Sequence, residues 1–179
     1  MIVEGASDQL ALETLALRRG RNLEDEGVSI VPLGGAHGIR TFLEKLFADG
    51  SNLKLAGLCD LKQEPDFRRA LERAGVGSNL SHDDMERLGF YVCDADLEDE
   101  LIRSLGMEAV EKVIEARGEL RSYRSLQRQP AQRGRTKLQH LRRFMSSKAG
   151  RKALYARALV EALDLDDVPR PLDRVLAHV

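Results

Sequence analysis

The chain begins "MIVEGASDQLALETLALRRG" (residues 1–20), in which three apolar residues run directly into an acid, a glycine and a second acid before a helical pattern starts. The two acids, Glu4 and Asp8, are four positions apart, and leucines recur with helical spacing from position 10. That spacing predicts a helix over about residues 8–23 with Ser7 as its N-cap. A very short strand therefore ends on an acid, and we expect Glu4 and Asp8 to face one crevice at its end.

A short apolar run followed by a helical pattern occurs three more times. The runs are "VSIVPLGG" (28–35), "LKLAGLCD" (53–60) and the start of "GFYVCDADLEDELIRSLG" (89–106); after the first two, helices are expected at about residues 39–47 and 66–74. Apolar runs of this length that alternate with helices are typical of a parallel sheet covered on both faces. The sequence thus predicts an α/β fold in which a roughly four-stranded, mostly parallel sheet is flanked by helices.

Beyond position 106 the strand pattern stops. The helical patterns there lie at about residues 107–116, 119–128, 138–146 and 150–163, with a last short helix near the C-terminus. We therefore divide the chain into an α/β core, residues 1–106, and a basic helical extension, residues 107–179, packed on it. The stretch "QRQPAQRGR" (127–135) is predicted as a loop because its proline and glycine interrupt the helix.

The two parts differ in charge, although the whole chain has a net charge of −1. Residues 1–116 hold 13 Lys and Arg against 23 Asp and Glu, whereas residues 117–179 hold 15 against 6. Residues 117–152 alone hold twelve basic residues and one acid, Glu119. An acidic half beside a basic half favours metal ions on one side and a polyanion on the other. The plainer explanation, a basic helical face that only keeps the protein soluble, stays open.

The remaining composition excludes several classes of protein. No apolar run approaches the roughly 20 residues that a bilayer span needs, and no signal peptide precedes the first acid. We therefore expect a cytoplasmic protein without a membrane partner. The two cysteines, Cys59 and Cys93, each end an apolar run and are too few for a zinc knuckle, so we expect buried, reduced thiols.

Three of the four apolar runs end in acids, at Glu4, at Asp60 and in residues 94–100. Ligands of parallel sheets bind beyond the carboxyl ends of the strands, so these acids are expected at one edge. Carboxylates that lie so close together repel one another unless a cation lies between them. Mg²⁺ prefers carboxylate and phosphate oxygens as its ligands. Two such ions about 4 Å apart can activate a water and stabilise the leaving oxygen of a phosphodiester.

The stretches "VEGASD", "GLCD" and "DLEDEL", in this order and at these intervals, resemble the motifs of a Toprim domain, and within that superfamily those of the nuclease domain of the overcoming-lysogenisation-defect (OLD) family. The resemblance covers nearly the whole chain, since a basic helical segment with a functional lysine follows the core in that family too. It implies a DNA nuclease that depends on one or two Mg²⁺ or Mn²⁺ ions. It leaves open whether a separate ATPase acts with the chain and whether the chain forms a homodimer.

Carried over by position, the resemblance implies a catalytic set of four acids and one lysine: Glu4, Asp8, Asp60, Glu98 and Lys152. The four acids would hold the metal ions with Asp96 as a further ligand, and Lys152, with Lys148 as its rival, would stabilise charge that develops on the phosphate. The basic residues expected to contact the nucleic acid are Arg142, Arg143, Lys148, Arg151 and Lys152.

One position departs from the family pattern. Lys62 stands where the second acid of D-x-D belongs, which removes one metal ligand and adds a positive charge. The acids that could replace it are Glu64, Asp94, Asp96 and Glu100. Lys62 therefore also favours an alternative function, a catalytically weakened Toprim-like module that binds DNA or a protein partner.

Capping offers a plainer interpretation of some of these acids. Glu4 and Asp8 could serve only the first turn of the helix, where acids favour the macrodipole. In "DLEDEL", Asp96 could be the N-cap and Asp99 a solvated first-turn residue. Asp60 has no such explanation, because an aspartate at the end of an apolar strand needs a partner.

Overall fold

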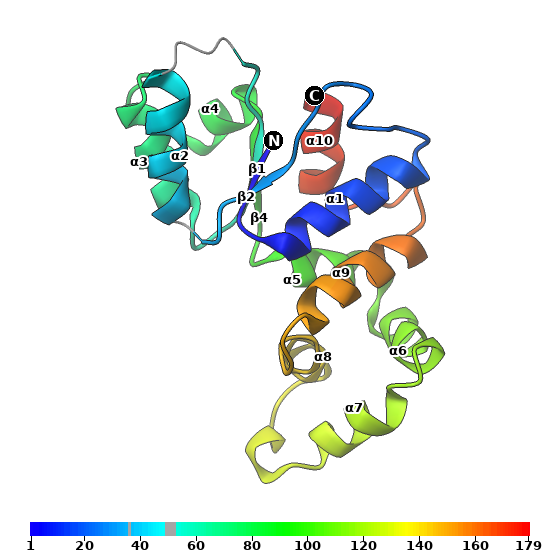
Figure 1. The fold of residues 1–179 in the computed structure, drawn as a ribbon. Coiled ribbons are helices and arrows are strands. Elements are labelled where there is room, and N and C mark those ends of the chain that lie inside the picture. The colour runs from blue at the N-terminus through cyan, green and yellow to red at the C-terminus, as the bar shows by residue number, and fades with distance from the viewer. Residues whose placement is uncertain (36, 49–52) are drawn as a thin grey trace.

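The structure is a computed structural model, and it describes residues 1–35, 37–48 and 53–179. Four short strands form one sheet in the order β2-β1-β3-β4, and every pairing in it is parallel (Figure 1). The strands are β1 (Ile2–Val3), β2 (Val31–Pro32), β3 (Gly57–Asp60) and β4 (Phe90–Cys93). The predicted α/β class and the four-stranded parallel sheet are confirmed, although each strand is shorter than the apolar run that predicted it.

Helices follow each strand and fill the C-terminal part. Within the core they are α1 (Ala6–Arg18), α2 (His37–Ala48), α3 (Glu64–Arg73), α4 (His82–Arg87) and α5 (Leu97–Leu105). The later ones are α6 (Met107–Ala116), α7 (Leu120–Gln127), a 3₁₀ turn η1 (Pro130–Gln132), α8 (Lys137–Met145), α9 (Arg151–Ala162) and α10 (Arg170–His178). None of the helices described is long and apolar enough to cross a membrane.

One local prediction was wrong, and one helix was missed. Ser7 is not the N-cap of α1, because the helix already starts at Ala6 and Gly5 is the capping residue. The side chain of Asp8 reaches back and accepts a hydrogen bond from the backbone N–H of Gly5 at 2.9 Å. The helix α4 was not predicted, although Ser81 and Asp84 form a capping box at its start.

Both faces of the sheet are covered, because alternate residues of each strand point to opposite sides. Ile2, Cys59 and Phe90 pack into an apolar cluster with side chains of α2, α3 and α4. Val3 and Leu58 belong to a second, larger cluster on the other face, where α1, α5 and α10 lie. Both cysteines are buried free thiols, as expected.

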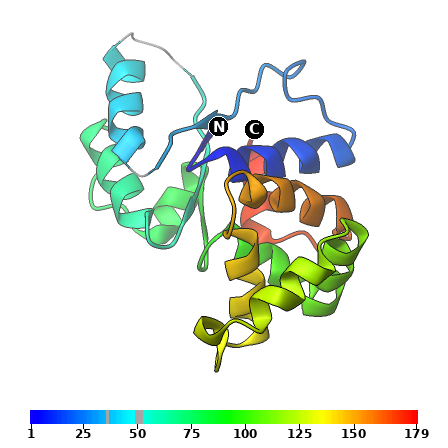
Figure 2. The ribbon, with the colours of Figure 1, turned by 60° about the horizontal axis from the view of Figure 1, so that its bottom comes forward.

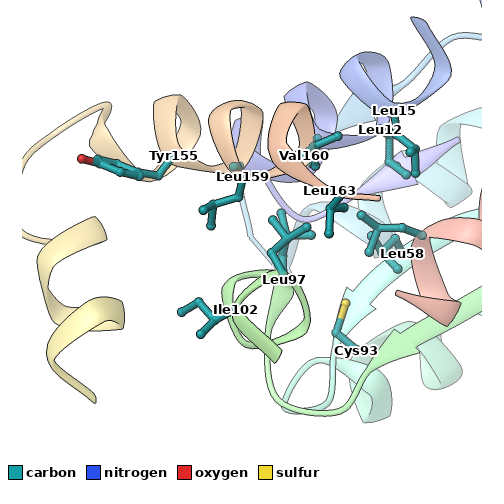
Figure 3. Close-up of a cluster of buried hydrophobic side chains, with 14 of the residues drawn as sticks. Leu12, Leu15, Leu58, Cys93, Leu97, Ile102, Tyr155, Leu159, Val160 and Leu163 are labelled. Carbon is teal, nitrogen blue, oxygen red and sulfur yellow. The ribbon is translucent and has the colours of Figure 1, made fainter. Parts of the chain in front are cut away.

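The larger cluster continues into the C-terminal helices. Helix α9 packs across α1 and α5, so that Leu159 and Val160 meet Leu12 and Leu97 (Figure 3). Helices α6, α7 and α8 lie on the side of α5 and α9 that is remote from the sheet (Figures 1 and 2). One core cluster thus includes residues from both sides of the boundary that we predict at position 106. It also fixes α9 beside the first turns of α1 and α5, which carry acids.

The aromatic side chains of this C-terminal part are inside. Tyr123 and Phe144 are fully buried, and their rings meet edge to face with centroids 5.3 Å apart. Phe144 contacts Tyr155 in the same way at 5.9 Å. Stacking on nucleic-acid bases is therefore not available to Tyr123 or Phe144, which instead hold α7, α8 and α9 together.

Candidate functional site

Four acids gather at the carboxyl edge of the sheet. Glu4 directly follows β1 and Asp60 ends β3, and these two strands are parallel neighbours. Asp8 lies in the first turn of α1 and Glu98 in the first turn of α5. The fold therefore brings together the acids that the sequence separates by up to 94 positions.

Two of these acids carry oxygen atoms without a donor. Gln63 donates from its Nε2 to Glu4 Oε1 at 3.3 Å, while the second oxygen of Glu4, Oε2, is buried with no hydrogen-bond partner. Lys152 Nζ lies 3.1 Å from Glu98 Oε2, while Glu98 Oε1 is buried and has no partner. Glu98 as a whole is only 5% exposed. Buried carboxylate oxygens that lack donors are costly, so both are sites where a cation would be stabilising.

Burial raises the pKa values of the other two acids, Asp8 and Asp60. Burial, together with the neighbouring charges of Glu4 and Asp8, raises the pKa of Asp60 to about 7, although Lys152 acts in the opposite direction. Burial likewise raises the pKa of Asp8 to about 6, against the lowering effect of the Gly5 N–H. Both carboxyl groups therefore gain from a nearby positive charge.

The lysine of α9 supplies part of that charge. Burial raises the pKa of Glu98, and Lys152 beside it works in the opposite direction. Burial also works against the charge on Lys152, yet Glu98, Asp8 and Asp60 together outweigh it and the pKa of Lys152 is raised. Lys152 is thus a firmly protonated ammonium in contact with one site acid and within electrostatic reach of Asp8 and Asp60.

Asp96 has two roles in the structure. Its Oδ1 caps α5 by accepting the backbone N–H of Asp99 at 2.9 Å, so the capping interpretation of Asp96 is confirmed. Its Oδ2 pairs with Arg142 of α8, whose guanidinium also lies 3.7 Å from Asp99. Helix α8 is in this way fastened to the acidic edge.

A groove opens beside this contact. It has a volume of about 660 Å³ and is lined by two of the site acids and by four cations, among other residues: Asp96, Glu98, Arg135, Gln139, Arg142, Arg143, Ser146 and Lys152. Arg143 is exposed, as is Arg135 in the loop before α8. The start of α5, with Asp96 and Glu98, and the basic helical extension therefore share one concave surface.

The five basic residues expected at a nucleic acid are placed unequally. Arg142, Arg143 and Lys152 line the groove, and Lys148 is exposed in the turn before α9. Arg151 departs from the expectation, because it is only 5% exposed. Its guanidinium pairs with Glu119 at 2.5 Å and lies 4.2 Å above the ring of Phe144. Arg151 therefore holds the C-terminal helices together and is not presented to a ligand.

This placement of Arg151 gives a stability prediction. We expect Arg151→Ala to lower the free energy of unfolding by about 3 kcal/mol, because it leaves the Glu119 carboxylate with the Tyr155 hydroxyl but without a cation, and it removes the guanidinium from the ring of Phe144. Urea unfolding followed by circular dichroism measures the change. Arg143→Ala, on the exposed face of α8, is the control and should leave the midpoint where it is. Equal midpoints for the two variants would show that the buried pair contributes nothing.

Most of the acids proposed as substitutes for the missing ligand are engaged elsewhere. Asp94 pairs with Arg103 at 2.8 Å, and Glu100 accepts the Asp94 backbone N–H at 2.8 Å. Glu64 lies 3.6 Å from the ring of His82. Lys62 itself is exposed. Three residues of the site were not predicted from the sequence: Gln63, which contacts Glu4, and Arg135 and Gln139, which line the groove.

The first part of the chain matches a known sequence family. The sequence model described as "Overcoming lysogenization defect protein-like, TOPRIM domain" matches residues 1–61. A search of curated proteins finds no match.

Solved structures extend the likeness along the chain. The C-terminal region of the Burkholderia pseudomallei OLD protein superposes with a TM-score of 0.75 at 20% identity, covering 99% of this chain and 94% of that one. The C-terminal region of the Xanthomonas campestris pv. campestris OLD protein gives 0.69 at 23% identity, covering 99% and 91%. The chain is therefore a Toprim-like α/β protein whose residues 1–61 match the OLD-like Toprim family and whose whole fold is that of OLD C-terminal regions.

Proposed function

We propose that this protein is a divalent-metal-dependent DNA nuclease that hydrolyses phosphodiester bonds with Mg²⁺ or Mn²⁺. The observation that carries the proposal is the pair of buried carboxylate oxygens without donors, Glu4 Oε2 and Glu98 Oε1, at an edge that also holds Asp8 and Asp60. Cations would stabilise an acidic edge whose buried oxygens lack donors. The adjoining groove, lined by arginine and lysine, suits a phosphate backbone.

The residues at this edge fit a hard divalent cation. Mg²⁺ and Mn²⁺ take oxygen ligands from a few carboxylates and keep waters or substrate phosphate oxygens for the rest. In the described part of the chain, no three acidic, histidine or cysteine side chains already stand close enough together to hold an ion. Glu4, Asp8, Asp60 and Glu98 are the residues that would hold such an ion, once Lys152 releases Glu98.

A bound ion would polarise the phosphate and lower the pKa of the attacking water. The chain itself would supply the rest. Asp60 and Glu4 would hold the ion at the strand ends, and Asp8 would contribute a carboxylate from the first turn of α1. Lys152, freed from Glu98, would stabilise negative charge on the scissile phosphate. Arg142 and Arg143 would bind the flanking phosphates through their planar guanidinium groups.

The groove gives a test of nucleic-acid binding that does not depend on cleavage. We expect the double variant Arg135→Gln, Arg143→Gln to weaken binding of double-stranded DNA in EDTA and to reduce the slope of log K against log[salt] by about 2, about 1 for each lost phosphate contact. Fluorescence anisotropy over a series of NaCl concentrations measures both. The matched control is Arg40→Gln, because Arg40 is exposed and lies in α2, on the other face of the sheet. A slope equal to that of the wild type would remove the groove from the proposal.

The nuclease activity itself is tested on supercoiled plasmid DNA with Mn²⁺, Mg²⁺ or EDTA. Nicking or linearisation that requires a divalent ion supports the proposal. Intact plasmid under every metal, from protein that is folded and still shifts DNA in a gel, would contradict it. The family resemblance leaves open whether a separate ATPase or a second copy of the chain takes part.

A second candidate function is a binding module that has lost turnover. The exposed Lys62 in place of an acid favours it, and so do the ion pairs that Arg142 and Lys152 make with Asp96 and Glu98. The variant Lys62→Asp separates the two candidates. If it raises Mn²⁺-dependent cleavage from nothing, the natural protein is the binding module. If a wild-type activity is already present and changes little, the nuclease stands.

A further inference from the structure

The turn after β3 decides which side chain returns to the acidic edge. The Gln63 backbone N–H donates to the Asp60 carbonyl at 2.9 Å and closes a four-residue turn. The two middle residues of that turn face outward: Leu61 is 51% exposed and Lys62 is exposed as well. Gln63 is the residue that comes back over the end of the strand, just before α3 begins.

The Gln63 amide is only half satisfied there. A carboxylate accepts hydrogen bonds and cannot donate them, so the Gln63 NH₂ group must face Glu4 Oε1, as it does at 3.3 Å. This leaves Gln63 Oε1 buried without any donor. Three acceptor oxygens at the same edge now lack partners, on Gln63, Glu4 and Glu98. A bound cation would satisfy all three of these oxygens.

We propose that the side-chain carbonyl of Gln63 is a ligand of the divalent cation, and that it supplies the oxygen that Lys62 does not. The inference rests on the cation site of the proposed function and adds a residue to it. Amide carbonyl oxygens are ordinary ligands of hard cations. The acids that could otherwise replace the missing ligand are held by Arg103, His82 or Arg142.

A neutral ligand also has an electrostatic consequence. The acidic edge repels itself when no ion is bound, and a fifth carboxylate beside Glu4 would increase that repulsion. Gln63 offers an oxygen without the charge, so it keeps the metal-free state more stable at some loss of cation affinity. Exchanging it for glutamate should therefore tighten cation binding and destabilise the metal-free protein.

The experiment is a calorimetric titration of Mn²⁺ alone into the full chain, paired with thermal melts in EDTA and in Mn²⁺. We expect Gln63→Met, which keeps the length of the side chain, to weaken Mn²⁺ binding about tenfold or more. Gln63→Glu should bind Mn²⁺ more tightly than the wild type, with a lower melting temperature in EDTA. Gln129→Met, at an exposed position beyond α7, is the matched control and should bind as the wild type does.

The outcomes separate this inference from the function on which it rests. If the wild type binds Mn²⁺ and both Gln63 variants bind with the same affinity, Gln63 is not a ligand and the cation site stands. If the wild type binds no Mn²⁺, the proposed function fails first and this inference fails with it. If Gln63→Met does not fold, Gln63→Glu decides alone, and unchanged Mn²⁺ affinity in that variant would overturn the inference.

Discussion

Asp60→Asn is expected to lower metal-dependent DNA cleavage by about a thousandfold, which corresponds to about 4 kcal/mol of transition-state stabilisation. Asp60 ends the central strand β3, and burial with the charges of Glu4 and Asp8 raises its pKa to about 7. An asparagine of the same shape keeps the fold and removes the charge that a divalent ion would neutralise. Initial rates of plasmid nicking at saturating Mn²⁺ measure the loss.

The matched control for this variant is Asp94→Asn. Asp94 also follows a strand of the sheet, but its side chain is 75% exposed and pairs with Arg103 at 2.8 Å. We expect its cleavage rate to stay at the wild-type value, while both variants keep the wild-type affinity for DNA in EDTA. A fall of equal size in the two variants, or an active Asp60→Asn, would contradict the placement of the ion at the end of β3.

The metal-free protein should lose stability as the pH rises from about 4 to about 7. The pKa of Asp8 is raised to about 6 and that of Asp60 to about 7, mainly by burial. A raised carboxyl pKa means that the folded state binds the proton more tightly than the unfolded chain, so the cost appears once the unfolded chain has released its proton near pH 4 and is complete above the folded pKa. Asp8 alone, buried and raised by about 2 units, accounts for about 3 kcal/mol.

Urea unfolding in EDTA at pH 5 and pH 8 measures this loss. At pH 5 the carboxyl groups with lowered pKa, such as Glu119 and Glu86, are still charged, so acid unfolding does not mask it. The variant Asp8→Asn should lose less stability than the wild type between pH 5 and pH 8, and the loss that remains should be that of Asp60, whose pKa is raised mainly by burial. Mn²⁺ should restore most of the lost stability at pH 8 and little at pH 5, where protons compete for the same oxygens. A metal-free protein with equal stability at both values would contradict the crowding of acids at this edge.

The fold was predictable because its strands and helices alternate in the sequence. Four apolar runs, each followed by a helical pattern, were enough to give a parallel sheet, and Ile2 and Val3 show how two residues suffice when both faces are buried. Capping was less predictable. Ser7 has the right chemistry for an N-cap, yet the helix starts before it, and the Asp8 side chain accepts a hydrogen bond from the backbone N–H of the capping residue, Gly5. Helix α4 has six residues and was too short to show a period.

The candidate site was predictable where it depends on strand ends and not where it depends on turns. Parallel strands bring their last residues to one edge, which located Glu4 and Asp60 from the sequence. Gln63 could not be found in this way, because only the closed turn after β3 shows that it returns to the edge while Lys62 faces solvent. The positive charge of Arg151 led us to expect it at the nucleic acid. In the structure it is buried and pairs with Glu119, the one acid of the basic segment.

The central claim is that a divalent cation binds among the acids at the carboxyl edge of the sheet. Anomalous diffraction at the manganese edge, from a crystal of the wild-type protein soaked in MnCl₂, tests it most directly. We expect a peak in contact with the carboxylates of Glu4 and Asp60, with Lys152 withdrawn from Glu98. Under saturating Mn²⁺, no peak at this edge together with an intact contact between Lys152 and Glu98 would contradict it.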